Sequence, residues 1–199
     1  MKRYVPVLIA IGIMLAAALF GYDRITTPAH DQPTPDFALR SFLGVNTLRG
    51  EFIVPEGDKI FLVSLLEYKD GKLANKAGSS FGSVEHTAPG PLTAEVLWGK
   101  SGDKDWLTLF GPGAAGSQDE DDFWKQLDGG ISSIPQGARE NHDGYEIIGF
   151  AESSLQHDGT KSDVNGGTFT SALAERKYVG ALGVRTFKTM DEAENAAHP

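Results

Sequence analysis

The chain has 199 residues, of which 40% are hydrophobic and 10% aromatic, a composition typical of one globular domain and not of a disordered chain. Cysteine is absent, which excludes a disulfide scaffold, a thiolate zinc site and a cysteine nucleophile. The formal net charge is −9, so no nucleic-acid partner is expected, because such binding depends mainly on cationic side chains.

The N-terminal segment has the pattern of a membrane anchor. Residues 4–22 contain no charged side chain and would span about 28 Å as a helix, close to the thickness of a bilayer core. Lys2 and Arg3 precede this run, which favours a short cytoplasmic tail over residues 1–3. We expect a single-pass signal-anchor that tethers the protein to a membrane. A cleaved signal peptide, with Ala16–Ala18 as its small-residue site, is the alternative.

A proline-rich linker and a folded domain follow the anchor. Residues 23–36 contain three of the ten prolines and no apolar periodicity, which is typical of a stiff spacer. We expect a β-rich globular domain over 37–187 and a short helix and tail over 188–199. Anchor and signal peptide both place this domain outside the cytoplasm, in the periplasm or at the cell surface of a bacterial-type envelope.

Between residues 37 and 187 the pattern indicates short strands separated by turns. The strongest strand covers Lys59–Tyr68, whose nearly continuous apolar run is typical of a strand buried on both faces. Asp70-Gly71 then predicts a hairpin turn, because both central residues of such a turn need a positive φ. The expected core residues of the strand are Phe61, Val63, Leu65 and Leu66. Further strands are expected over 51–54, 80–86, 93–98, 105–110, 146–152 and 178–187.

Ser117 and Glu120 match a capping box, the pattern in which an N-cap hydroxyl and a Glu three residues later satisfy free backbone N–H groups. This predicts a helix that runs to about Leu127 and stops before the following glycines. The helix would bury Phe123, Trp124 and Leu127.

Thr189 and Glu192 match a second capping box, which predicts a short C-terminal helix. Residues 37–42 and 171–177 fit a helix or a strand. Together these elements predict a mainly β fold, a β-sandwich-like domain with one or two short helices. A mixed α+β domain is the alternative.

The acidic run Asp119–Asp122 has the residue types of a calcium-binding loop. An EF-hand needs Gly at its sixth position and Glu at its twelfth, but these positions hold Trp124 and Gly130. Acidic side chains in the first turn of the predicted helix are the simpler interpretation. A second polar loop could hold Ca²⁺ weakly or consist of ordinary turns, and its oxygen ligands would be Asp158, Asp163 and Asn165.

Ser80 occupies the central position of a literal G-x-S-x-G pattern, Gly78 to Gly82. That motif needs a buried strand before the serine and a helix after it, and neither is predicted here. His86 is six residues away, about 20 Å along a shared strand, too far to act as its base. We therefore expect no hydrolytic activity that depends on Ser80.

The sequence His-Asp-Gly occurs twice, at His142 and at His157. The simpler interpretation is two Asp-Gly turns that bracket a strand. A shared metal site or a base–carboxylate pair is the alternative, with His86 as a third candidate ligand. Whether the three histidines converge stays open at this point.

Trp98 and Trp106 flank one predicted hairpin. With an odd loop they would face each other, and an exposed pair would form a stacking platform for sugars or aromatic ligands. With an even loop Trp98 would face Leu107, and Trp106 would point the other way. Burial of each indole in the core is the competing interpretation.

We interpret the chain as a membrane-tethered extracytoplasmic binding or assembly module. The membrane contact would be made through residues 4–22, and the ligand would be a protein or a glycan. An extracytoplasmic hydrolase that uses Ser80 or a His–Asp site is the alternative. No catalytic residue, cofactor-binding residue or metal ligand is assigned.

Overall fold

A computed structural model of the chain describes residues 44–197, apart from 88, 102–103, 113, 120–121 and 164–166. The side chains of 86, 101, 104–105, 114–119 and 197 also lie outside this description. The chain divides into two compact units, Met1–Leu39 and Arg40–Pro199. The expected anchor, the linker and the segment 37–42 lie outside the described residues. Within the described residues, no helix is long and apolar enough to cross a membrane.

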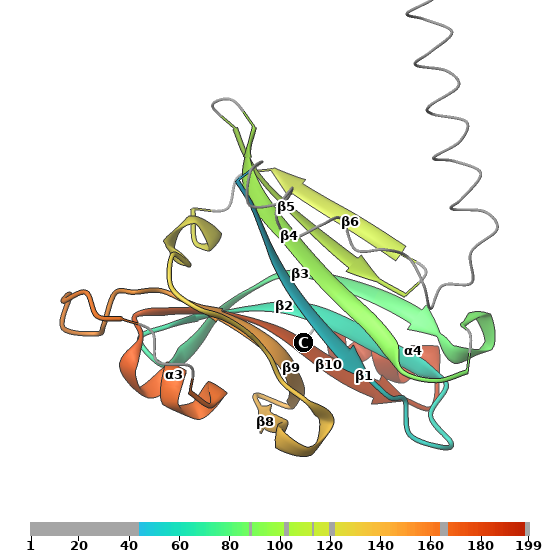
Figure 1. Cartoon of the computed structure of the whole chain (residues 1–199). Coiled ribbons are helices and arrows are strands. Elements are labelled where there is room, and N and C mark those ends of the chain that lie inside the picture. Colours follow the sequence, from blue (N-terminus) through green and yellow to red (C-terminus); the bar gives the residue numbers. More distant parts are fainter. Residues whose placement is uncertain are drawn as a thin grey trace, which may run out of the picture. The chain divides into compact units, whose positions relative to one another are not determined.

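The described part is built from two antiparallel β-sheets (Figure 1). The first sheet has the strand order β1 (Val45–Phe52), β4 (Leu92–Ser101), β5 (Lys104–Gly111) and β6 (Ala114–Asp119). The second has the order β3 (Lys72–Ser83), β2 (Ile60–Lys69), β10 (Tyr178–Phe187), β9 (Tyr145–Glu152) and β7 (Ile131–Ser133), and β8 (Glu140–His142) also pairs with β9. The predicted mainly β class is confirmed.

The main hydrophobic core lies between the two sheets. It joins Leu48 and Val96 of the first sheet to Val63, Leu65 and Leu182 of the second, which fits the predicted β-sandwich. β2 is an interior strand of its sheet, between β3 and β10. One of its faces packs in this main core and the other in a second apolar cluster, so both faces are buried. The four residues predicted as core in this strand are at most 2% exposed, and the prediction is confirmed for Phe61, Val63, Leu65 and Leu66.

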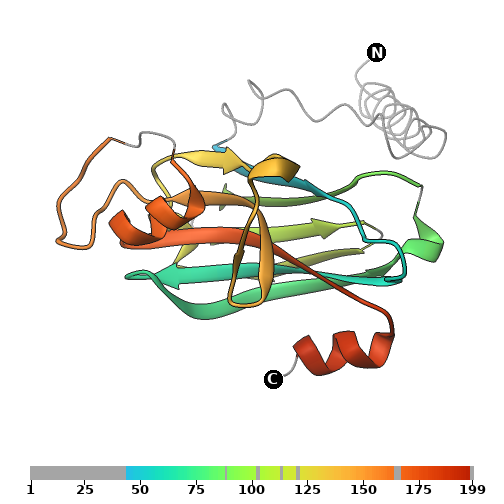
Figure 2. The same ribbon diagram turned by 90° about the horizontal axis from the view of Figure 1, so that it is seen from below.

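Helices cover the outer face of the second sheet, as Figure 2 shows. Phe169 of α3 (Phe169–Glu175) packs on Leu66 and Tyr68 in a second apolar cluster. The ambiguous segment 171–177 is therefore mainly helix. α4 (Met190–Ala197) lies near the other end of the sheet and buries Ala193.

The predicted C-terminal helix is confirmed, and one of the two bonds of its capping box is present. The backbone N–H of Glu192 donates to the Thr189 hydroxyl at 3.3 Å, and the backbone N–H of Lys188 donates to the Glu192 carboxylate at 3.0 Å. Glu192 thus accepts from the residue before the N-cap and not from the N-cap itself, while Thr189 caps the helix as predicted.

The helix predicted from Ser117 to Leu127 is wrong. Ser117 belongs to β6, which pairs with β5, and the described residues from the end of β6 to Leu127 form only the short 3₁₀ helix η2 (Trp124–Gln126). Pairing with β5 outweighs the local capping signal, because it gives the backbone of β6 a series of hydrogen bonds, whereas an N-cap satisfies only one or two N–H groups. The predicted burial of Trp124 and Leu127 is nevertheless correct, and Phe123 is half-buried.

The other predicted strands are present with different ends, and the short strands β7 and β8 were not predicted. Asp70 and Gly71 have φ of 50° and 75°, which confirms the predicted hairpin turn. After this turn the polar segment that begins at Lys72 pairs with β2 and forms β3. The strand predicted over 80–86 therefore begins at Lys72. It gives way to the 3₁₀ helix η1 (Val84–His86). The strand predicted over 51–54 likewise extends back to Val45, where pairing with β4 begins.

Candidate functional site

All three tryptophans of the chain line one cleft of about 280 Å³. It lies where β4 ends, β5 begins and η2 closes the end of the sandwich. We call it the tryptophan cleft. Its wall and floor are aromatic, and its polar lining comes from strands and loops that are distant in the sequence. Its lining includes Asn46, Trp98, Lys100, Trp106, Trp124 and Asp128.

Trp124 forms the fixed floor of the cleft and is 2% exposed. Its indole N–H donates to the buried Glu67 carboxylate at 2.9 Å, and its ring meets Trp98 edge-to-face at 5.1 Å. The ring edge also rests on β10 at Gly180, where an added Cβ would lie 3.0 Å from the indole and 2.7 Å from Leu127. These contacts hold the floor in one position, which favours a preformed site.

Trp98 and Trp106 do not form a facing pair. Ser101 pairs with Lys104, which leaves an even two-residue loop, so Trp98 lies opposite Leu107 and Trp106 lies opposite Gly99. Trp98 is 4% exposed and belongs to the core. Trp106 is only half-buried, and an added Cβ on Gly99 would lie 3.2 Å from its ring. The chain therefore has the second of the two predicted registers, and Trp106 is the accessible indole.

The rim of the cleft offers hydrogen-bonding groups of different kinds. Asn46 and Lys100 are exposed, and neither makes a hydrogen bond or ion pair with another described residue. Asp128 accepts hydrogen bonds from the backbone N–H and hydroxyl of Ser154 at 2.8 and 3.0 Å, and pairs with Lys161 at 3.2 Å. Partial burial raises the pKa of Asp128, but these bonds lower it more, so the carboxyl is ionised. An amide, a cation and a carboxylate thus surround the indoles.

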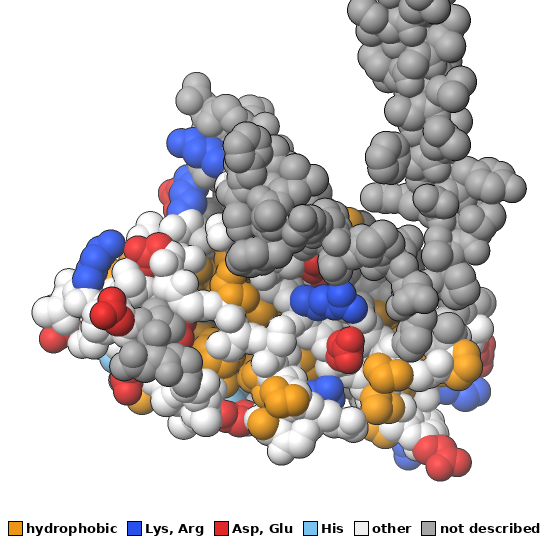
Figure 3. Space-filling model, in the orientation of Figure 1, with side chains coloured by type: hydrophobic (Ala, Val, Ile, Leu, Met, Phe, Trp, Pro, Cys, Tyr) orange, Lys and Arg blue, Asp and Glu red, His pale blue; other side chains and the backbone are white. Residues whose placement is uncertain are grey.

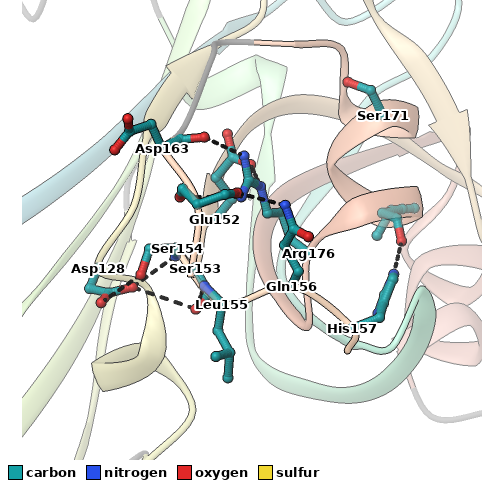
Figure 4. A network of polar contacts seen from close by, with 12 residues as sticks. Asp128, Glu152, Ser153, Ser154, Leu155, Gln156, His157, Asp163, Ser171 and Arg176 are labelled. Carbon is teal, nitrogen blue, oxygen red and sulfur yellow. Dashed lines mark hydrogen bonds and ion pairs between the residues drawn. The ribbon is translucent and has the colours of Figure 1, made fainter. Parts of the chain in front are cut away.

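The loop that holds Asp128 is itself fixed by a buried ion pair (Figure 4). The side chains of Glu152 and Arg176 are each 4% exposed, and Arg176 Nε lies 2.9 Å from the carboxylate. Arg176 also donates to the carbonyl of Asp163 and to the Ser162 hydroxyl. Burial raises the pKa of Glu152, and the guanidinium opposes this effect. The pair is closed off from solvent and serves to anchor the loop.

Ser80 is not placed as a nucleophile. It lies within β3 opposite Val63, is 7% exposed, and its hydroxyl has no hydrogen-bond partner among the described residues. A catalytic serine needs an adjacent base and an exposed turn, and the described surroundings of Ser80 provide neither.

The histidines contact different partners. His142 lies 3.3 Å from Glu140 and 3.2 Å from Thr170 in the first turn of α3, whereas His157 lies 3.4 Å from Asp70 and 3.1 Å from a carbonyl in its last turn. The side chain of His86 is outside the described part. Across the described residues, no group of three acidic or histidine side chains could hold a metal ion. The Asp-Gly pairs after both histidines form turns, as predicted.

Two carboxylates of the predicted acidic segments bond to neighbouring side chains or backbone groups. Asp158 accepts hydrogen bonds from the backbone and hydroxyl of Thr160, which closes a local turn. Asp122 pairs with Lys125 at 2.6 Å. The described residues that follow the acidic run form only a 3₁₀ helix, so its predicted role in the first turn of an α-helix is wrong. Asn165 lies outside the described residues.

The sequence pointed to two of the cleft's tryptophans but not to its rim. Asn46, Lys100 and Asp128 carry no motif and meet only because strand pairing and η2 bring them to one end of the sandwich. The aromatic side chains around residues 98–124 were the one available signal. No protein-family model, curated protein or solved structure matches the chain, so the assignment of this site rests on its geometry and chemistry.

Proposed function

We propose that the protein is a membrane-tethered extracytoplasmic binding module and that the tryptophan cleft receives its ligand. The observation that carries this proposal is the convergence of all three tryptophans on one cleft of about 280 Å³. Binding sites for small groups are usually concave and apolar, with a few polar side chains that fix orientation. The cleft has this combination, with aromatic walls and Asn46, Lys100 and Asp128 at its rim.

The cleft suits a single ring-sized, amphipathic group. Its volume is near the lower end of the range for ligand pockets, so an entire peptide segment would not fit inside it. The negative face of an indole attracts the positively polarised C–H groups of a ligand ring. Asn46 can donate and accept hydrogen bonds, and Lys100 can donate them, at the polar edge of the same ring.

The alternative, an extracytoplasmic hydrolase, lacks a comparable observation. Ser80 is buried in a strand without a described base beside it, and His142 and His157 bind separate partners. A function in binding therefore has more support than one in catalysis.

Intrinsic fluorescence provides a direct test, because every tryptophan lines the cleft. We expect members of a panel of monosaccharides and aromatic fragments to shift the emission. Asn46→Ala should weaken binding roughly two- to tenfold, since it removes one hydrogen bond. Asn141→Ala is the matched control, because Asn141 is exposed and does not line the cleft. A panel without any ligand, or equal losses in the two variants, would contradict the proposal.

The membrane tether is a separate part of the proposal, supported by the uncharged run over residues 4–22. We expect the protein in the membrane fraction to have an intact mass that includes this run. Deletion of residues 4–22 should move the protein to the soluble fraction. A mature protein that begins near Leu19 or His30 would instead indicate a cleaved signal peptide.

A further inference from the structure

We propose that the ligand is a linear, uncharged glycan that continues from the tryptophan cleft along the seam between β1 and β7. This inference rests on the proposed function, since it extends the same site. It names the ligand class and adds a second contact region, centred on Ile53.

Two further hollows follow the cleft along β1. Asn46 and Ile131 line the cleft, and the next hollow, of about 440 Å³, is lined by Arg49 on the same strand and by Ser133 on β7. A third, of about 430 Å³, shares Ile53 and Pro91 with the second. The distance along the chain from residue 46 to 53 is about 23 Å, enough for several linked sugar rings.

Exposed apolar side chains lie in this series of hollows. Ile131 and Ile53 are each 43% exposed, and they belong to the few large hydrophobic side chains that the described part exposes. Ile131 lines the cleft, and Ile53 lines both further hollows. Figure 3 shows this face, where separate hydrophobic patches alternate with single cationic and anionic side chains along β1.

A peptide added as an extra strand is disfavoured at this edge. β1 is the outermost strand of its sheet, but two of its edge carbonyls already accept side-chain hydrogen bonds. Ser133 donates to the carbonyl of Arg49 at 2.5 Å, and Arg139 donates to the carbonyl of Glu51 at 2.6 Å. A peptide backbone would have to displace both bonds to pair there. Recognition along the seam must therefore come from side chains.

The side chains along the seam match the chemistry of a neutral sugar chain. The guanidinium of Arg49 lies 3.7 Å from the carboxylate of Glu51, so the seam has charges of both signs. A strongly charged polymer would therefore gain little electrostatic binding energy there. Gln136 adds an amide that donates and accepts. Sugar hydroxyls also donate and accept, and the C–H faces of the rings can cover Ile131 and Ile53.

The test is the dependence of affinity on chain length. The full chain, purified without sugar-based detergent, is titrated with the monomer, dimer, tetramer and hexamer of β-1,4-linked glucose and of β-1,4-linked N-acetylglucosamine. In at least one series the tetramer should bind at least about tenfold more tightly than the monomer. Ile53→Ser should abolish this gain and leave monomer affinity unchanged. Met190→Ser should keep the gain, because Met190 is also 43% exposed but lies on α4.

The results separate this inference from the proposed function. Equal affinity for monomer and hexamer would contradict the proposal that the glycan extends along the seam. A gain in affinity with chain length that remains in Ile53→Ser would contradict it as well. Binding of aromatic fragments but of no saccharide from either series would overturn the glycan while leaving a binding cleft. A length-dependent gain for extended peptides that Ile53→Ser removes would assign the seam to a protein ligand, which also overturns the glycan.

Discussion

Replacement of Arg176 by methionine is expected to lower the free energy of unfolding by about 3–5 kcal/mol, because it leaves a buried carboxylate without its cation. Glu152 and Arg176 are each 4% exposed, so solvent cannot replace the lost partner. The substitution also removes the donor to the carbonyl of Asp163. The loss should be smaller at low pH, since a protonated Glu152 is less costly to bury and its pKa is already raised by burial.

Urea denaturation of residues 37–199 measures this effect. The double variant Arg176→Met/Glu152→Leu should recover most of the loss, because it removes both buried charges together. Arg49→Met is the control, since Arg49 is 43% exposed and its ion pair contributes about 0.5 kcal/mol or less. A loss below about 1 kcal/mol for the single variant would mean that the pair does not anchor the loop.

Leu65→Ala is expected to lower the free energy of unfolding by roughly 2–5 kcal/mol, because the cavity lies in the centre of the main core. Leu65 is 2% exposed and lies on β2 between two neighbouring strands, so the surroundings cannot easily collapse into the space. Phe110→Ala is the matched control, since Phe110 is 39% exposed on β5. Equal losses for the two variants would contradict the assignment of β2 as a buried interior strand.

The features that the sequence predicted correctly are those set by neighbours in the chain. The apolar run of β2 signals burial on both faces, and Asp70-Gly71 supplies the two positive φ angles of its hairpin. Thr189 and Glu192 satisfy backbone groups within four residues of each other. In each case the residues that decide the structure also carry the signal.

The features that the sequence did not predict depend on distant partners. Ser117 has the pattern of an N-cap, yet pairing with β5 places it in a strand. The site depends in the same way on pairing, because Asn46 meets Trp98 only through the register of β1 on β4. Asp128 reaches the rim through its bonds to Ser154, a contact that no local spacing indicates. Pairing between distant segments therefore forms the site, and the sequence alone predicted only two of its tryptophans, Trp98 and Trp106, as candidates for ligand binding.

The central claim is that the ligand enters the tryptophan cleft, and NMR of the ¹⁵N-labelled protein tests it most directly. Each indole N–H gives its own signal, and that of Trp124 is already bonded to Glu67. On addition of a ligand found by fluorescence, we expect the signals of Trp106, Trp98 and the Asn46 side-chain amide to shift, with a smaller change at Trp124. Shifts confined to other parts of the protein, with all three indole signals unchanged, would contradict the account.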